Sequence, residues 1–210
     1  DNIQNRIIKC SSTIRVSLDT YISNKTIMIK STSVKPIRPN WQMFHKGVSE
    51  SLADEIVTMA DKTEEAKTFG GHEARRSKVS WIKNPQVLNM LYEFVDIANR
   101  NAFKVNVFKK ADIQYTEYCS TEKGFYDWHH DIDWNEYEGT DRKLSVTVQL
   151  SNPDEYSGGD FTFGEVVCPD QKLKDKGTVL VFPSYLRHQV EPVTKGIRKS
   201  LVAWFQGPYW

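Results

Sequence analysis

The order of the patterned segments in this chain predicts an α+β fold that is mainly β. Two observations lead to this prediction. Apolar residues recur at helical spacing between about residues 51 and 98, whereas from Phe103 onward apolar and polar residues alternate. Because helices come first and many short strands follow, we expect an antiparallel β-sandwich or barrel buttressed by N-terminal helices.

The composition indicates one globular domain. The chain has 210 residues, of which 39% are hydrophobic and 26% are charged, enough for one substantial core. Its 28 basic residues are balanced by 27 acidic ones, so the net charge of +1 gives no footprint for nucleic acid. No apolar run approaches the roughly 18 residues of a membrane helix. Neither a nucleic-acid partner nor a membrane is therefore expected.

The cysteines bear on the compartment. Cys10, Cys119 and Cys168 form an odd, sparse set without close pairs, which argues against a disulfide framework or a thiolate zinc site. The first residues lack the basic-then-apolar pattern of a signal peptide. A reducing, cytoplasmic setting is the expectation.

The first forty residues differ in composition from the rest. Residues 1–40 are rich in Ser, Thr, Ile and Lys, with a β-like run at Thr26–Lys30, and they end on two prolines, Pro36 and Pro39. Proline removes a backbone donor and restricts the residue before it. We interpret residues 1–40 as an N-terminal extension and residues 41–210 as the folded domain.

Two helices are predicted before the strands. The first spans about residues 51–66 and places four apolar residues on one stripe. The second is better marked, because Asn84 can cap it and Pro85 suits its first turn. The apolar stripes, which we assign to the core, consist of Leu52, Ile56, Met59 and Ala60 in the first helix and Val87, Leu88, Leu91, Phe94, Val95 and Ala98 in the second.

Strands are predicted at residues 103–107, 144–150, 178–182 and 198–206. Phe103, Val105 and Val107 alternate with polar residues, and the same period continues from Leu144 to Leu150. Residues typical of turns separate the strands. These turns are expected at Asn152-Pro153-Asp154, Ser157-Gly158-Gly159-Asp160, Lys176-Gly177 and Lys195-Gly196.

The segment around His129 carries the chemistry. On an extended strand, residues two apart point to the same face, so His129 and Asp131 can present an imidazole and a carboxylate side by side. With one further imidazole they would form a two-histidine, one-carboxylate metal site. His188, which follows the predicted strand 178–182, can supply it.

A carboxylate-binding group stands at a fixed distance beyond His188. Arg198 lies ten positions later, and Ser200 follows at the next position on the same face of the strand. A guanidinium grips a carboxylate with two parallel hydrogen bonds, and a hydroxyl adds one more donor. This pair suits the remote carboxylate of a dicarboxylic acid.

The ordered set of motifs resembles the iron(II)/2-oxoglutarate-dependent dioxygenase superfamily, and within it the prolyl 4-hydroxylase-like branch of bacterial and phage type. The resemblance covers roughly residues 41–207. The segments that carry it are Tyr118, Gly124–Asp131, Arg142–Ser145, Gly158–Phe161, Gly177–Pro183 and His188–Trp204, with the helix region Trp81–Asn101.

The resemblance implies a double-stranded β-helix, or jelly roll, and a set of site residues. His129, Asp131 and His188 would bind Fe(II). Arg198, helped by Ser200, would bind the C5 carboxylate of 2-oxoglutarate, and O₂ would be the second co-substrate. Tyr118 resembles the family tyrosine that contacts the same carboxylate, although its eleven-residue distance from His129 is slightly longer than usual.

Other residues near this segment have weaker roles. His130 and Asp133 offer a rival ligand pair, but the position two after His130 is Ile132, so His129 is preferred. His130 is expected outside the ligand set. Trp128 and Trp134 flank the segment and suit either a substrate wall or ordinary packing.

The implied activity is hydroxylation of an unactivated C–H bond with release of succinate and CO₂. The motifs favour a prolyl residue of a peptide or protein as substrate, by analogy with the family. The alternatives are a hydroxylase of a free amino acid or other small molecule, or a jelly-roll binding module without catalysis. Nucleic acid is disfavoured by the near-neutral charge.

Overall fold

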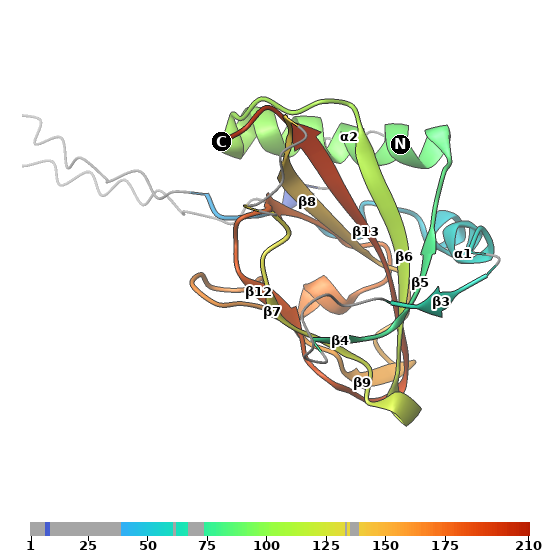
Figure 1. The fold of residues 1–210 in the computed structure, drawn as a ribbon. Helices are drawn as coiled ribbons and strands as arrows, with labels where there is room; N and C mark the ends of the chain where they lie inside the picture. The colour runs from blue at the N-terminus through green and yellow to red at the C-terminus, as the bar shows by residue number, and fades with distance from the viewer. Residues whose placement is uncertain (1–6, 9–38, 61, 67–73, 133, 135–138) are drawn as a thin grey trace, which may run out of the picture.

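Two antiparallel β-sheets form the body of the protein (Figure 1). The computed structural model describes residues 7–8, 39–60, 62–66, 74–132, 134 and 139–210. The predicted fold is confirmed: the protein is mostly β, its sheets are antiparallel, and the arrangement is that of a jelly roll. Side chains of both sheets line one pocket, so the sheets face each other across it.

The large sheet has the strand order β1-β2-β11-β8-β13-β6-β5-β3, and β9 pairs with β13. Its strands are β1 (Ile7–Ile8), β2 (Gln42–Phe44), β3 (Glu64–Glu65), β5 (Lys78–Trp81), β6 (Ala111–Cys119), β8 (Asp141–Gln149), β9 (Tyr156–Gly158), β11 (Val179–Pro183) and β13 (Val193–Gly207). The small sheet has the order β10-β12-β7-β4. Its strands are β4 (Arg75–Arg76), β7 (Phe125–His129), β10 (Phe161–Phe163) and β12 (His188–Val190).

Two α-helices cover the outer face of the large sheet, α1 (Glu50–Thr58) and α2 (Pro85–Ala98). The predicted cap of α2 is confirmed, since Asn84 Oδ1 accepts from the backbone N–H groups of Gln86 and Val87 at 2.8 and 3.2 Å. Short helical turns connect other elements: a π-helical turn at Asn99–Phe103 and 3-10 turns at Ser120–Glu122 and Gln171–Lys174.

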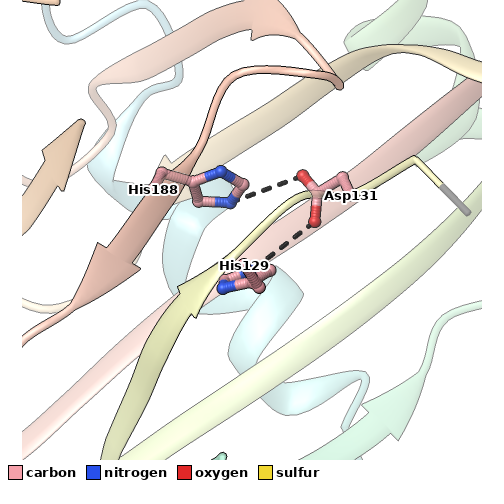
Figure 2. A group of neighbouring side chains, drawn as sticks. All are labelled: His129, Asp131 and His188. Carbon is pink, nitrogen blue, oxygen red and sulfur yellow. Dashed lines mark ion pairs between the residues drawn. The ribbon is translucent and has the colours of Figure 1, made fainter. Parts of the chain in front are cut away.

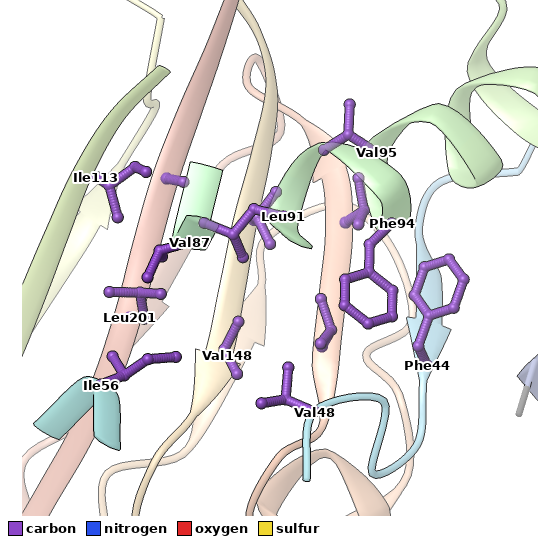
Figure 3. Packing of buried hydrophobic residues seen from close by; sticks show 14 of the residues in the cluster. Phe44, Val48, Ile56, Val87, Leu91, Phe94, Val95, Ile113, Val148 and Leu201 are labelled. Atoms are coloured by element: carbon purple, nitrogen blue, oxygen red, sulfur yellow. The ribbon is translucent and has the colours of Figure 1, made fainter. Parts of the chain in front are cut away.

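The main core lies between these helices and the large sheet (Figure 3). Alternate residues of β8 and β13 point into it, as the period of two predicts. The Phe44 and Phe94 rings pack with their centroids 5.0 Å apart. Each fully buried aliphatic or aromatic side chain contributes about 1.5–3 kcal/mol. The buried residues from the sheet include Leu144, Val146, Val148, Val179, Val181, Leu201, Ala203 and Phe205, and those from the helices include Ile56, Val87, Leu91, Phe94 and Val95.

The first predicted helix is too long. It ends at Thr58 rather than near residue 66, and Glu64–Glu65 forms strand β3 instead, paired with β5. Its apolar stripe stops at Ala60, and both residues of β3 are exposed. Without an apolar face to bury beyond residue 60, further helix would gain nothing from packing.

The strand predicted at residues 103–107 is wrong. Phe103 ends the π-helical turn, Lys104 has a left-handed backbone with φ of 55°, and residues 104–107 pair with no strand among the described residues. The Asn99 side chain both donates to Val105 O at 2.8 Å and accepts from Val105 N at 2.9 Å. The Asn99 side chain thus makes the hydrogen bonds to the Val105 backbone that a neighbouring strand would otherwise make.

The turn predicted at Lys195-Gly196 lies inside strand β13. Gly196 has φ of 68°, and the pairing of β13 with β9 shifts register between Val193 and Lys195. A glycine in a strand permits such a bend. The bend lets one long strand pair first with β9 and then with β6 and β8.

The predicted N-terminal extension, residues 1–40, lies outside the described residues except for residues 7–8 and 39–40. Ile7–Ile8 forms β1, which pairs with β2. The boundary at residue 40 and the domain 41–210 stay predictions. In the described part of the chain, no helix combines the length and the apolar character needed to cross a membrane.

Candidate metal centre and its pocket

Three side chains that could hold a metal meet at the small sheet (Figure 2). His129 ends β7, His188 begins β12, and the two residues are paired across these strands. Asp131 follows β7 and turns its carboxylate toward both rings. The potential ligand atoms all lie within 4.8 Å of one another. The Nε2 atoms of His129 and His188 are 3.6 and 3.5 Å from the carboxylate oxygens of Asp131.

The backbone decides which nitrogen of each histidine faces Asp131. His129 Nδ1 lies 2.7 Å from Asp127 O, and His188 Nδ1 lies 2.8 Å from Leu186 O. A carbonyl oxygen only accepts, so Nδ1 must carry the proton in both rings. The Nε2 lone pair is then left to face the carboxylate, which is the arrangement that a metal-binding histidine needs.

The protonation states suit a cation. Burial disfavours the charge of Asp131, but the positive charge that His188 and His129 carry when protonated, together with hydrogen bonds from His129 and Ser145, offsets burial and holds the pKa of the carboxyl below its usual value. Burial lowers the pKa of His188 to about 4, so its imidazole is neutral at pH 7. Metal ligands must be deprotonated. A carboxylate and an imidazole in these forms are ready to bind a metal.

Hydroxyl groups hold Asp131 in place. Ser145 Oγ donates to Asp131 Oδ2 at 2.6 Å, and Ser184 Oγ lies 2.9 Å from Ser145 Oγ. The backbone N–H of Asp131 donates to Ser184 O at 3.0 Å. Two histidines and one carboxylate on one side of a pocket fit a divalent ion with open positions on the other side, which is the donor set that iron(II) oxygenases use.

A β-bulge in β7 brings a tyrosine to the same place. His188 pairs with His129 and Val190 with Tyr126, so β7 has one more residue than β12 between the two pairs. Tyr126 therefore shares a face with His129, and their rings stack at 3.5 Å between centroids with an interplanar angle of 11°. Burial raises the pKa of the Tyr126 hydroxyl to about 12, so it stays neutral.

The predicted carboxylate-binding residues line the same pocket. Arg198 is 2% exposed, and its Nη1 donates to Ser200 Oγ at 3.4 Å, at the long end of hydrogen-bonding distance. Tyr118 faces it across the β13–β6 pairing, with the guanidinium 5.5 Å from the centre of its ring. His129, Asp131, His188, Arg198, Ser200 and Tyr118 all line one pocket between the two sheets.

A second cavity adjoins this pocket at Arg198. It has a volume of about 240 Å³ and shares Arg198 and Phe161 with the first. Gln149 and Tyr156 also line it, and the buried Tyr156 hydroxyl has no hydrogen-bond partner among the described residues. Gly159 makes room for the arginine, because a Cβ there would lie 2.9 Å from Arg198 Cδ.

Three residues near the cluster are not part of it. His130 is exposed, and its Nδ1 lies 2.8 Å from Tyr185 O. Trp128 packs against the Arg187 guanidinium, which lies 5.2 Å from its ring, and Trp134 is 67% exposed. Neither tryptophan lines the pocket. The rival ligand Asp133 lies outside the described residues.

Sequence reasoning missed several pocket residues. Tyr126 was hidden by the bulge, because a period of two places it on the opposite face from His129. The role of Ser145 beside Asp131 and that of Gln149 in the second cavity were also missed, because in the sequence both are ordinary polar members of an alternating strand. Arg75 lies on β4, a strand of only two residues that the sequence does not predict.

The chain is similar to a family of oxygenases. A family model described as the 2OG-Fe(II) oxygenase superfamily matches residues 113–206. A PKHD-type hydroxylase of Nitrosomonas europaea is 30% identical over 131 residues, which cover 59% of this chain and 57% of that protein. A PKHD-type hydroxylase of Pseudomonas putida is 24% identical over 168 residues, which cover 73% and 74%. The chain thus spans little more than half of the Nitrosomonas relative and 28% of a relative from Burkholderia ambifaria.

Solved structures show the same fold. A prolyl-4-hydroxylase of Pseudomonas putida superposes with a TM-score of 0.63 at 18% identity, covering 81% of this chain and 94% of that one. A prolyl hydroxylase from Trichoplax adhaerens, in complex with a peptide fragment of the hypoxia inducible factor oxygen degradation domain, has a TM-score of 0.62 at 14% identity. It covers 79% of this chain and 83% of that one.

Proposed function

We propose that this chain is a 2OG-Fe(II) oxygenase and that it hydroxylates an unactivated C–H bond of a prolyl residue in a peptide or protein. The observation that carries the proposal is the cluster of His129, Asp131 and His188 in one pocket with Arg198. The family requires Fe(II), 2-oxoglutarate and O₂.

The described residues fit these groups. His129, Asp131 and His188 would hold the iron through two Nε2 atoms and a carboxylate. Arg198 would bind the far carboxylate of 2-oxoglutarate with Ser200 and Tyr118 beside it. When bound, iron(II) with 2-oxoglutarate supplies the oxidative chemistry: one atom of O₂ enters the substrate as hydroxyl, and 2-oxoglutarate becomes succinate and CO₂.

The chain's own part is to orient and to exclude water. The carbonyls of Asp127 and Leu186 hold the Nδ1 protons, and Ser145 holds the carboxylate, so the ligand atoms are already directed before a metal binds. The stacked Tyr126 ring covers one side of His129.

The proposal of a peptide substrate is supported by the names of similar proteins. The two solved prolyl hydroxylases share the fold, and one of them is bound to a peptide. The PKHD-type relatives are hydroxylases. These likenesses favour a prolyl peptide over a free amino acid.

Succinate formation tests the proposal. The purified chain is given Fe(II), 2-oxoglutarate and O₂ with and without a panel of proline-containing peptides, and His129→Ala serves as control. Peptide-stimulated succinate that the variant does not form is the expected result. Turnover that no peptide stimulates would indicate a small-molecule substrate in place of a peptide. No turnover despite bound metal would favour the non-catalytic binding module.

We also propose a cytoplasmic location. Cys119 and Cys168 are free thiols, as a reducing compartment allows. Fractionation of the source cells tests this, and recovery of the protein from an oxidising compartment would contradict it.

A further inference from the structure

A second arginine reaches the metal pocket from the small sheet. Arg75 lies on β4 and is paired with Tyr126 of β7. Its guanidinium carbon is 4.7 Å from the centre of the Tyr126 ring, which in turn stacks on His129. Arg75 lines the same pocket as His129, Asp131 and Arg198. The pocket thus has guanidinium groups from two different sheets.

The hydrogen bonds of Arg75 leave part of its guanidinium unused. Nε donates to Ser77 Oγ at 2.7 Å, and Nη2 donates to Gln114 Oε1 at 2.8 Å and to Thr116 Oγ1 at 3.1 Å. A guanidinium has five N–H donors, and the two on Nη1 have no partner among the described residues. All three acceptors are neutral, and within the described residues Arg75 forms no ion pair.

The charges of the pocket do not balance without a further anion. Asp131 contributes one negative charge, and Arg75 and Arg198 contribute two positive ones. A divalent metal and the dianion of 2-oxoglutarate cancel each other. One positive charge therefore remains in a half-buried site, where an unpaired charge is costly and a carboxylate partner is favoured.

We propose that Arg75 is a second carboxylate-binding arginine of this pocket, placed on the metal side, as Arg198 is placed for the far carboxylate of 2-oxoglutarate. The inference rests on the proposed function and makes it more specific. The carboxylate has two candidate sources. A carboxylate of the primary substrate, close to the reacting carbon, would supply the missing anion. The proximal carboxylate of 2-oxoglutarate, whose charge is already counted, would satisfy only the unused Nη1 donors.

A purely structural role for Arg75 must be separated from this one. Gln114 and Thr116 are 5% and 0% exposed, so losing their arginine donor would cost stability whether or not a ligand binds. Arg76 provides a matched control. Its guanidinium lies over the Phe125 ring at 5.5 Å and donates to Glu122 O at 2.6 Å, and Arg76 does not line the pocket.

Ligand binding without turnover tests the proposal. The full chain, loaded with Mn(II) and kept free of O₂, is titrated by calorimetry with 2-oxoglutarate and with 2-oxobutanoate, which lacks the distal carboxylate. The variants are Arg75→Gln, Arg198→Gln and Arg76→Gln. A second titration, with 2-oxoglutarate present, uses a proline peptide with aspartate beside the proline, the same peptide with asparagine, and free L-proline against L-prolinamide.

Each source predicts its own pattern. If Arg75 holds the proximal carboxylate, Arg75→Gln weakens both keto acids about tenfold or more, as loss of a charge-assisted hydrogen bond does. Arg198→Gln then weakens 2-oxoglutarate alone. If Arg75 holds a substrate carboxylate, both keto acids bind normally, and Arg75→Gln removes the preference for the aspartate peptide or for L-proline.

Other outcomes overturn the proposal. Unchanged keto-acid affinities together with unchanged peptide and proline preferences in Arg75→Gln would leave only the structural role. If Arg75→Gln does not fold, Arg75→Met, which also removes the charge and the donors, is titrated in its place, and keto-acid affinities and peptide preferences equal to wild type would overturn the proposal. A wild-type chain that binds Mn(II) but not 2-oxoglutarate would overturn the proposed function as well, and so the two failures are distinguishable.

Discussion

The two faces of strands β8 and β13 are both largely buried but differ in chemistry. The face toward the helices carries Leu144, Val146 and Val148 from β8 and Leu201, Ala203 and Phe205 from β13, all 0% exposed. The face toward the small sheet carries Ser145, Thr147, Gln149, Arg198 and Ser200, of which none exceeds 4%. The degree of burial therefore does not distinguish the face that packs into the core from the face that lines the pocket. The alternation of side chains along the strand does.

The largest effect is expected from removing the charge that the polar face holds. Asp131→Asn should weaken Mn(II) or Fe(II) binding by more than the roughly 100-fold that loss of an outer partner of a metal ligand costs. Because its neighbours hold the pKa of Asp131 below its usual value, the folded state favours the carboxylate, and the metal-free variant should be less stable than the metal-free wild type at pH 7.

Calorimetry of metal binding and thermal unfolding, each with and without metal, check both statements. A variant that binds metal normally would remove Asp131 from the ligand set. A metal-free variant that unfolds at the wild-type temperature or above would contradict the stabilising contribution of the carboxylate.

Neighbouring residues of β13 offer a direct comparison of the two faces. Leu201→Ala should lower the free energy of unfolding by about 2–5 kcal/mol, because it opens a cavity in the core. Ser200→Ala, one position away, should cost no more than about 1 kcal/mol, since it removes one long hydrogen bond. Urea denaturation measures both. Equal losses in the free energy of unfolding would contradict the assignment of one face to stability and the other to the site.

An intermediate effect is expected from the outer partner of the carboxylate. Ser145→Ala removes the hydroxyl that donates to Asp131 Oδ2 and should weaken metal binding about 10- to 100-fold. Ser145→Thr keeps the hydroxyl and should recover part of the loss. Competition with a chelator gives the affinities, and a wild-type value for Ser145→Ala would show that the Ser145 hydroxyl does not position the carboxylate for metal binding.

The smallest effect concerns Cys168, which packs beside the apolar cluster between the sheets. Burial raises the pKa of its thiol to about 11, and the thiol donates to Phe161 O at 3.0 Å. Only the thiolate is alkylated, so its rate should rise about tenfold per pH unit between pH 8 and 10. Mass spectrometry after timed iodoacetamide treatment measures the rate. A rate that levels off near pH 9 would contradict the raised pKa.

Periodicity and motif spacing predicted much of the molecule. The change of period located α2 and strands β8, β11 and β13, and alternation assigned Arg198 and Ser200 to one face. The structure brings His129, Asp131 and His188 together, as the motif led us to expect. Their metal binding stays a prediction.

The errors share a physical cause, which is that local patterns do not report tertiary partners. Residues 103–107 alternate like a strand, yet the Asn99 side chain takes the place of a neighbouring strand. Arg75 has no motif around it, and its importance depends on contacts with Gln114 and Thr116, about forty residues away. Long-range contacts of this kind leave no trace in a short window of sequence.

The bulge in β7 limits how this segment can change during evolution. Deleting one residue between Tyr126 and His129 would restore regular pairing with β12 but would turn the tyrosine away from the imidazole on which it stacks. Adding one residue there would turn the His129 side chain to the opposite face of the sheet from His188. Related chains that keep this site should therefore differ from it here by substitution and hardly ever by gaps. Tyr118 lies eleven positions before His129, so a sequence pattern that requires a shorter fixed spacing between these two residues would not match this chain.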